Sequence, residues 1–295
     1  MTEPTFTLPD AKDIELGQRG STRVYDTGPA VDAPGDLPPL LLLHGWNVDS
    51  TVNFGYAIDK LAKTRRVVMY DHHGHGHGPR STSRFTLEDA AQDAISLLDT
   101  LEIDGAVVVG YSMGGAIGQI IAHQFPERCK GLVLMATAGV FCTERRERAM
   151  FGAFGTAGRS LRRVPPNGRD AAFGQILKAA SGAYPAWILD RVRQADPVVL
   201  LEAGAALGNF DSSAWIASLD TPVASVITTR DQVIPTARQV ELAVAAGAVN
   251  IESVDATHHL PVMGDPRFVS SIERSVAAVD AALVGRNNHQ VLSGH

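Results

Sequence analysis

Ser112 lies in the pentapeptide Gly110-Tyr-Ser-Met-Gly114, whose residue types and spacing suit a nucleophile. A β-branched run, 107–109, stops at Gly110, and small helix-compatible residues begin directly after Ser112. This pattern predicts a strand that turns sharply into a helix, with glycines where larger side chains would clash. The hydroxyl would then lie at the carboxyl end of the sheet, near the N–H of Met113 and the positive end of the helix. A serine that only caps a helix is the alternative, and the pentapeptide alone does not decide between them.

A neutral serine needs a base, and two loops downstream carry suitable partners. Asp231 follows a predicted strand at 223–229, and His258 and His259 follow another at 249–254. In a parallel sheet both loops would open at the edge where Ser112 lies. A histidine can take the serine proton and return it later, while an ionised aspartate fixes the histidine tautomer. The chain order Ser, Asp, His is the order expected when the nucleophile sits between a strand and a helix.

A further part of the predicted site is His44-Gly45-Trp46, which follows a buried strand pattern at 40–43. Gly45 lets the backbone pass close to a substrate. The N–H groups of Trp46 and Met113 are therefore predicted to form an oxyanion hole, which would stabilise negative charge on a substrate oxygen.

The elements that would carry these loops alternate between strand and helix patterns. An amino-terminal hairpin is predicted at 14–16 and 22–25, followed by a loop at 28–39. Buried strand patterns occur at 40–43, 67–70 and 132–135, and further strand patterns at 106–109, 223–229 and 249–254. Helix patterns occur at 53–63, 86–101, 113–124, 236–246 and 266–284. The fold class predicted is α/β, with a mostly parallel central sheet flanked by helices.

One long region interrupts this alternation. Between about 139 and 218 no buried strand is evident, and helical segments such as 175–181 and 186–195 are separated by prolines. We therefore predict a core domain formed by 1–138 and 219–295, with a helical cap inserted at 139–218. The polar end of the chain, from Gly285, is expected to fray.

The composition favours one large domain that acts on small molecules. The chain has 295 residues, of which 45% are apolar, enough for a substantial core. A formal net charge of −6 gives no reason to expect binding to nucleic acid or to an anionic membrane. The first residues do not resemble a signal peptide, no apolar stretch is long enough to span a bilayer, and there are only two cysteines. We expect a cytoplasmic protein that is a monomer or a homodimer.

Taken together, these motifs resemble the α/β-hydrolase family, in its serine-hydrolase branch with a helical cap. The resemblance extends from His44-Gly45-Trp46 through the glycine and histidine loop 71–76 and the Ser112 turn to Asp231 and His259-Leu260-Pro261. It implies hydrolysis of a carboxylic ester through an acyl-enzyme, without a cofactor. This chain has His73 where the family often has arginine, and His258 where it usually has glycine. His259-Leu260-Pro261 fits the family's His-x-Pro pattern, so His259 is the predicted base and His258 the alternative.

The same motifs are compatible with other functions on this fold. A C–C bond hydrolase or a perhydrolase would use the same three catalytic residues, and a non-enzymatic receptor for small molecules could keep them as well. Dehalogenase and epoxide-hydrolase chemistry is disfavoured, because those branches place aspartate where Ser112 stands.

The predicted substrate-binding residues combine the oxyanion loop with apolar residues of the insertion: Trp46, Met113, Phe151, Phe154 and Trp187. Seven arginines lie between 144 and 169; they either steer a carboxylate-bearing substrate or form a solvated helix face. The histidines at 72, 73, 75 and 77 could suit a metal, but the alternating glycines indicate a turn. The sequence therefore predicts no metal site.

Overall fold

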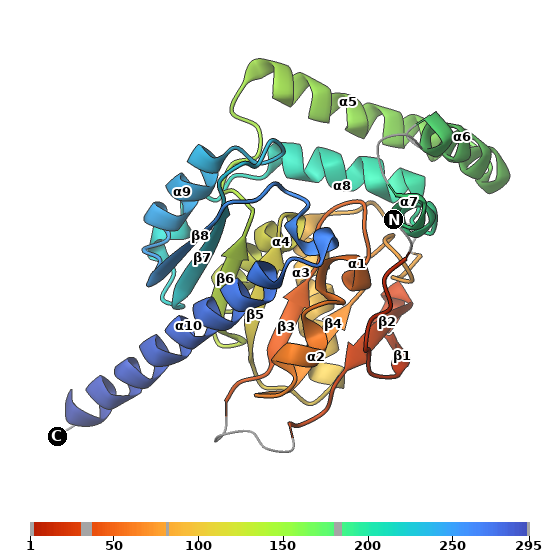
Figure 1. Ribbon diagram of the computed structural model, residues 1–295. Helices are drawn as coiled ribbons and strands as arrows, with labels where there is room; N and C mark the ends of the chain where they lie inside the picture. Colours follow the sequence, from red (N-terminus) through yellow and green to blue (C-terminus); the bar gives the residue numbers. More distant parts are fainter. Residues whose placement is uncertain (1–2, 31–36, 81–82, 180–184, 294–295) are drawn as a thin grey trace.

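The computed structural model describes residues 3–30, 37–80, 83–179 and 185–293 (Figure 1). Its centre is an eight-stranded sheet in the order β1-β2-β4-β3-β5-β6-β7-β8. The strands are β1 (Ala11–Glu15), β2 (Ser21–Asp26), β3 (Leu40–Leu43), β4 (Val67–Tyr70), β5 (Ala106–Tyr111), β6 (Cys129–Met135), β7 (Val223–Thr228) and β8 (Asn250–Val254). Strands β3 to β8 pair in parallel, whereas β1 and β2 form an antiparallel hairpin that pairs with β4. The predicted fold class is confirmed.

Helices cover both faces of the sheet, which explains why central strands such as β3 and β4 are continuous apolar runs. Leu41 and Leu43 of β3 pack with the buried side chains of α3 (Leu87–Thr100) and α4 (Met113–Gln124), and α9 (Thr236–Ala245) joins this layer. Leu40 and Leu42 face the other way, toward α2 (Ile58–Leu61) and α10 (Pro266–Ser293). Successive residues of one strand thus supply two separate cores.

Among the described residues, four α-helices lie between β6 and β7: α5 (Arg145–Leu161), α6 (Pro166–Ala179), α7 (Ala186–Arg193) and α8 (Pro197–Asn209). The two ends of this segment meet where the N–H of Ser212 donates to the Gly139 carbonyl over 2.9 Å. Figure 1 shows α5 above α8, with both passing over the edge of the sheet near α4. Whether 139–218 forms a separate cap domain stays a prediction.

Ion pairs fix α5 near both of its ends. Near its start, Glu147 pairs with Arg238 of α9 over 2.8 Å. At its end, Arg162 pairs with Glu202 of α8 over 2.7 Å, and the same carboxylate accepts a hydrogen bond from the N–H of Phe85. Glu202 is buried, so its charge depends on these partners. The inserted helices are therefore held to the core by charged contacts as well as by packing.

Several predicted element boundaries need correction. The helix expected at 53–63 is two short helices, α1 (Ser50–Phe54) and α2, and α1 begins earlier than predicted because Asp49 caps it by accepting from the N–H of Val52. The helix expected at 175–181 already begins at Pro166, as α6. Residues 180–181 of this prediction, and residues 31–36 of the predicted loop, lie outside the described residues. The expected fraying from Gly285 stays a prediction, and α10 itself extends to Ser293.

No helix in the part of the chain that the structure describes combines the length and apolar character needed to cross a bilayer.

Candidate active site

The turn at Ser112 has the strained geometry that the pentapeptide predicts. Ser112 adopts φ 54° and ψ −114° between β5 and α4, a conformation that few residues other than glycine take. A Cβ on Gly110 would lie 2.4 Å from the Gly114 carbonyl oxygen, and one on Gly114 would lie 2.0 Å from the Leu43 carbonyl oxygen. Only glycine fits at either position, so these residues allow β3, β5 and α4 to approach closely around the serine.

Two hydrogen bonds hold the Ser112 backbone in this conformation. Its N–H donates to the Met135 carbonyl over 2.9 Å, and its carbonyl accepts from Thr137 Oγ1 over 2.8 Å. Both partners belong to β6 or the residues directly after it. The neighbouring strand therefore supports the strained turn, and Ser112 as a whole residue is 7% exposed.

His258 lies between Ser112 and Asp231. Its Nε2 is 3.1 Å from Ser112 Oγ, and its Nδ1 is 2.7 Å from Asp231 Oδ2. An ionised carboxylate can only accept a hydrogen bond, which means that Nδ1 carries the proton and donates a hydrogen bond to Asp231. Nε2 is then left to accept from the serine hydroxyl. Three side chains from different parts of the chain are thus connected, each within hydrogen-bond distance of the next.

The prediction of His259 as the partner of Ser112 is corrected by this geometry. Tyr111 Oη donates to the His258 carbonyl over 2.7 Å, which fixes the backbone so that the His258 ring faces the serine. His259 is exposed and immediately precedes η3 (Leu260–Met263), and its N–H donates to Thr257 Oγ1. The His-x-Pro pattern pointed to His259, whereas the histidine within hydrogen-bond distance of Ser112 and Asp231 is its neighbour His258.

Asp231 is surrounded by hydrogen-bond donors. Oδ1 accepts from the N–H groups of Val233 and Ile234 over 2.8 and 2.9 Å. Oδ2 accepts from Thr228 Oγ1 over 2.7 Å and Gln239 Nε2 over 3.2 Å, in addition to His258. Burial raises the pKa of Asp231, but the hydrogen bond and charge of His258 and the other donors outweigh it and lower the pKa overall. The group is therefore a carboxylate near neutral pH.

The loop His44-Gly45-Trp46 passes directly beside the serine. A Cβ on Gly45 would lie 3.3 Å from Ser112 Cβ, and the Gly45 N–H donates to Asn53 Oδ1 over 2.7 Å. His44 Nε2 accepts from the N–H of His72, so His44 Nδ1 carries the proton and donates to the Gly45 carbonyl over 2.8 Å. Because the peptide is trans, the N–H of Trp46 points away from that carbonyl.

Three of the predicted substrate-binding side chains form one aromatic cluster. The Trp46 ring centroid is 6.3 Å from that of Phe151 and 5.7 Å from that of Phe154, and Trp46 Nε1 donates to the Leu200 carbonyl over 2.8 Å. This cluster joins the loop after β3 to α5 and α8. Trp187 lies elsewhere, in a separate buried cluster with Val52 and Ile188. Met113 is fully buried at the start of α4.

The predicted turn at 71–78 places several imidazoles in the interior. His44, His72 and His75 are fully buried, and the ring centroids of His44 and His72 are 4.2 Å apart. Within the described ranges, no group of three His, Cys, Asp or Glu side chains has the arrangement needed to hold a metal ion. Burial lowers the pKa of His72 well below its usual value and that of His75 to about 3. These histidines are neutral packing residues over the ordinary pH range.

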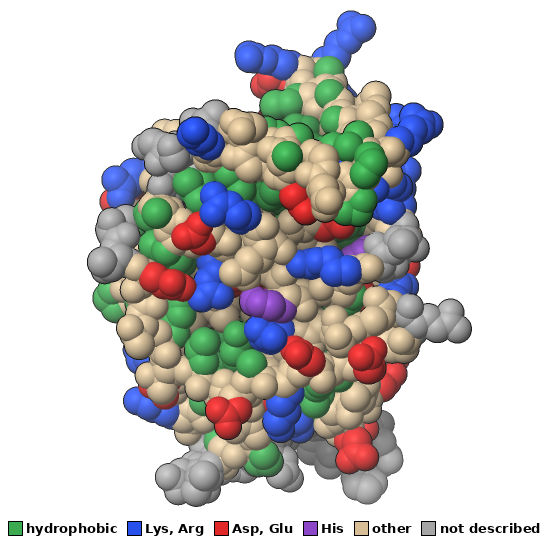
Figure 2. All heavy atoms as spheres, turned by 90° about the vertical axis from the view of Figure 1, so that its right-hand side faces the viewer, with side chains coloured by type: hydrophobic (Ala, Val, Ile, Leu, Met, Phe, Trp, Pro, Cys, Tyr) green, Lys and Arg blue, Asp and Glu red, His purple; other side chains and the backbone are tan. Residues whose placement is uncertain are grey.

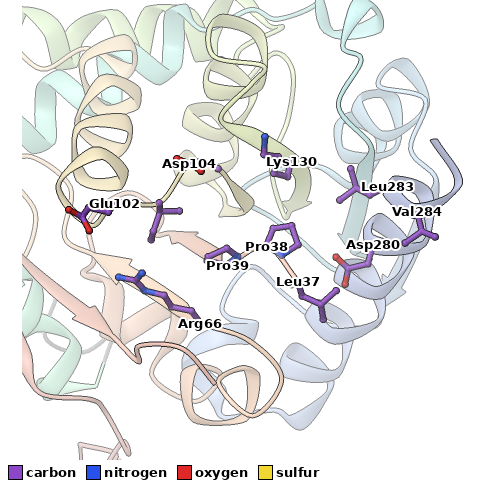
Figure 3. Close-up of a pocket in the computed structure, with 12 residues that line it drawn as sticks. Leu37, Pro38, Pro39, Arg66, Glu102, Asp104, Lys130, Asp280, Leu283 and Val284 are labelled. Atoms are coloured by element: carbon purple, nitrogen blue, oxygen red, sulfur yellow. The ribbon is translucent and has the colours of Figure 1, made fainter. Parts of the chain in front are cut away.

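A cavity of about 710 Å³ lies far from the serine (Figure 3). It is lined by residues that precede or begin the parallel strands, including Pro39 before β3, Arg66 before β4, Asp104 before β5 and Lys130 in β6. It therefore opens at the amino-terminal edge of the sheet, whereas Ser112 follows the carboxyl end of β5. Active groups of parallel sheets gather at the carboxyl edge, so this cavity is not the catalytic site.

The comparisons with known proteins agree with this fold. Residues 38–260 match the family described as alpha/beta hydrolase fold. The 2-hydroxymuconate semialdehyde hydrolase of Pseudomonas sp. (strain CF600) is 35% identical over 122 residues, which cover 40% of this chain and 41% of that protein. The match thus spans less than half of this curated relative's length.

Two solved structures resemble nearly the whole chain. The enol-lactonase from Burkholderia xenovorans LB400 has a TM-score of 0.72 at 22% identity, with 90% of this chain and 100% of that chain covered. A thermophilic esterase from Thermogutta terrifontis has a TM-score of 0.69 at 20% identity, with 92% and 99% covered. At such identities the likeness shows the fold alone. Because the family match spans most of the sequence, the chain belongs to the α/β-hydrolase fold family.

Proposed function

We propose that this protein is a serine hydrolase that cleaves carboxylic esters through an acyl-enzyme. The observation that carries the proposal is the line of contacts from Ser112 Oγ to His258 Nε2 and from His258 Nδ1 to Asp231 Oδ2, at 3.1 and 2.7 Å. It provides a hydroxyl, a base that can accept its proton and a carboxylate that stabilises the resulting imidazolium. Membership of a hydrolase family supports the same chemistry.

In the first half of the reaction, Ser112 Oγ attacks the ester carbonyl carbon while His258 Nε2 takes the hydroxyl proton. The carbonyl oxygen becomes negatively charged, and the N–H groups of Met113 and Trp46 donate to it. When the tetrahedral intermediate collapses, the bond to the alcohol oxygen breaks and His258 gives its proton to that oxygen. The alcohol leaves, and the acyl group remains on Ser112.

In the second half, water replaces the alcohol. His258 removes a proton from the water, whose oxygen attacks the acyl carbon, and the same two N–H groups receive the negative charge. The bond to Ser112 Oγ then breaks as His258 returns the proton to it. A carboxylic acid is released, and the protein regains its starting state with water as the only co-reactant.

The aromatic cluster of Trp46, Phe151 and Phe154 supports an apolar acyl group as the part of the substrate nearest the serine. Trp46 belongs to the loop that would supply one oxyanion donor, and the phenylalanines extend from it along α5. Trp187 lies in another cluster, so its position does not support the predicted role of Trp187 in substrate binding.

The decisive experiment compares Ser112→Ala, His258→Gln and His259→Gln in the hydrolysis of p-nitrophenyl esters of graded acyl length. We expect Ser112→Ala to lose covalent labelling by an organophosphonate. We expect His258→Gln to lower kcat at least about a hundredfold, because general-base catalysis contributes about that much or more. His259→Gln is the matched control, one residue away and exposed, and should retain the activity of the unaltered protein. Equal losses in both histidine variants, or labelling that persists in Ser112→Ala, would refute the proposal.

A second candidate is hydrolysis of a C–C bond with the same residues. It is favoured by the sequence similarity to 2-hydroxymuconate semialdehyde hydrolase over 40% of this chain. Product analysis with vinylogous diketones beside the ester panel separates the two activities. Turnover of the diketones with inert esters would support the C–C hydrolase, whereas no turnover of either class, with ligand-induced thermal stabilisation, would indicate a receptor.

A further inference from the structure

A second cavity, of about 540 Å³, lies between α6, the link from α7 to α8 and the loop that follows β4. We call it the arginine pocket, because Arg80, Arg169 and Arg193 line it together with Pro166, Asp170, Phe173, Gly174, Gln194, Ala195, Asp196 and Pro197. Figure 2 looks onto the side of the molecule that carries α6 and α7, where Lys and Arg side chains are spread over the upper and middle parts. Ser112, Asp231 and His258 do not line this cavity.

Within the described part of the chain, two of the three guanidinium groups hydrogen-bond to uncharged oxygens alone. Arg80 donates to the carbonyls of Gly76, Gly78 and Gln194 at 2.5 to 2.9 Å. Arg169 donates through Nε and Nη2 to two other carbonyls at 2.6 Å. Among the described residues, neither arginine forms an ion pair with a carboxylate. Carbonyl dipoles orient the guanidinium groups, but they do not cancel the positive charges.

The acidic side chains of the pocket leave it net positive. Asp170 and Asp196 face three arginines, and Asp196 Oδ1 already accepts from the N–H groups of Val198 and Val199 as the cap of α8. Arg193 pairs with Asp190, but both side chains are more than half exposed, so solvent weakens that pair. The formal charge of the lining is +1, in a chain whose formal net charge is −6. The local preference is therefore for an anion.

We propose that the arginine pocket binds a small organic molecule that carries a carboxylate or a phosphate group. Guanidinium groups match the planar oxygen pairs of both anions, and the free donors of Arg169 and Arg193 are the ones available to such a ligand. Phe173, with Pro166 and Pro197, supplies an apolar wall for the uncharged part of the molecule. The proposal is independent of the chemistry at Ser112.

The test is isothermal titration calorimetry at low ionic strength with phenyl phosphate, benzoate and neutral benzamide. We expect at least one of the two anions to bind while benzamide does not, and whichever binds more tightly identifies the preferred group. Binding should weaken as salt is added, because ionic contacts at partly exposed sites are screened. It should persist in Ser112→Ala, whereas a loss in variants of the lining arginines places the ligand in this pocket.

Two substitutions locate the ligand. Arg169→Gln and Arg193→Gln should each weaken anion binding about tenfold or more, as expected for the loss of a charged hydrogen bond. Arg159→Gln is the matched control, since it removes an arginine of α5 that is hydrogen-bonded to Thr156 and lies outside the lining. Arg80 is left unchanged because its guanidinium holds the turn at 76–78. No binding by either anion, equal binding of benzamide, or an equal loss in Arg159→Gln would overturn the proposal.

Discussion

Acid should destabilise this protein through His75, whose ring is completely buried in the turn after β4. Nδ1 donates to the His73 carbonyl over 3.0 Å, whereas Nε2 has no hydrogen-bond partner among the described residues. A second proton would therefore create a buried charge without an acceptor. Burial, followed by the charge of the nearby His44, lowers the pKa of His75 from 6.5 to about 3.

The direction and size of the effect follow from these two pKa values. Between pH 6.5 and pH 3 the unfolded chain binds a proton at His75 and the folded chain does not, so stability falls as the pH falls through this window. At pH 5, which lies 1.5 pH units below the pKa of His75 in the unfolded chain, the proton bound by the unfolded chain lowers the free energy of unfolding by about 2 kcal/mol. Asp93 acts in the opposite direction. Burial raises the pKa of its carboxyl to about 6, so protonation between pH 7 and pH 5 stabilises the folded state by about 1 kcal/mol.

The variant His75→Asn isolates the contribution of His75, because asparagine can still donate to the His73 carbonyl but does not titrate. Urea unfolding of both proteins at pH 7 and pH 5 gives four free energies, in which the Asp93 contribution cancels. The unaltered protein should lose about 2 kcal/mol more than His75→Asn between the two pH values. The same pH dependence in both proteins would refute the reasoning.

Four further substitutions test the packing and positioning described above. Gly114→Ala should lower the free energy of unfolding in urea by more than about 3 kcal/mol, since its Cβ would lie 2.0 Å from a carbonyl oxygen. Gly152→Ala is the control, and because the space around it is open, it should stabilise α5 by up to about 1 kcal/mol. Glu202→Gln should cost about 2 kcal/mol in the same assay because the half-buried Arg162 loses its charged partner, and an unchanged value would contradict that account. Gln239→Leu should lower kcat about ten- to hundredfold with little change in KM, because Asp231 loses one of the hydrogen-bond donors that orient its carboxylate. An unaltered kcat would count against this role of Gln239.

The sequence alone predicted the parts of the fold that depend on local patterns. Buried runs such as 40–43 and 67–70 are strands because both faces of a parallel sheet are covered. The turn at Ser112 followed from glycine spacing, and the position of Asp231 followed from the end of a strand. These are properties of residues within a few positions of one another, which explains why they could be predicted without coordinates.

The choice between two adjacent histidines could not be predicted in this way. Adjacent side chains point in different directions, and Tyr111, 147 residues away in the chain, holds the backbone that selects His258. The donors to Asp231 show the same limit. Thr228 ends a strand and Gln239 lies within a helix, and no sequence pattern marks either as a partner of a carboxylate. Such contacts depend on how elements pack, which local periodicity does not encode.

The protonation state of His44 links the buried histidines to the candidate active site. Its Nε2 accepts from the N–H of His72 and its Nδ1 donates to the Gly45 carbonyl, so both contacts require a neutral ring with the proton on Nδ1. A second proton on Nε2 would place two donors against each other and break the contact with His72. Burial lowers the pKa of His44 and keeps the ring neutral, despite the opposing effect of Asp71. The same desolvation that makes the turn sensitive to acid thus maintains the orientation of the peptide that carries the Trp46 N–H.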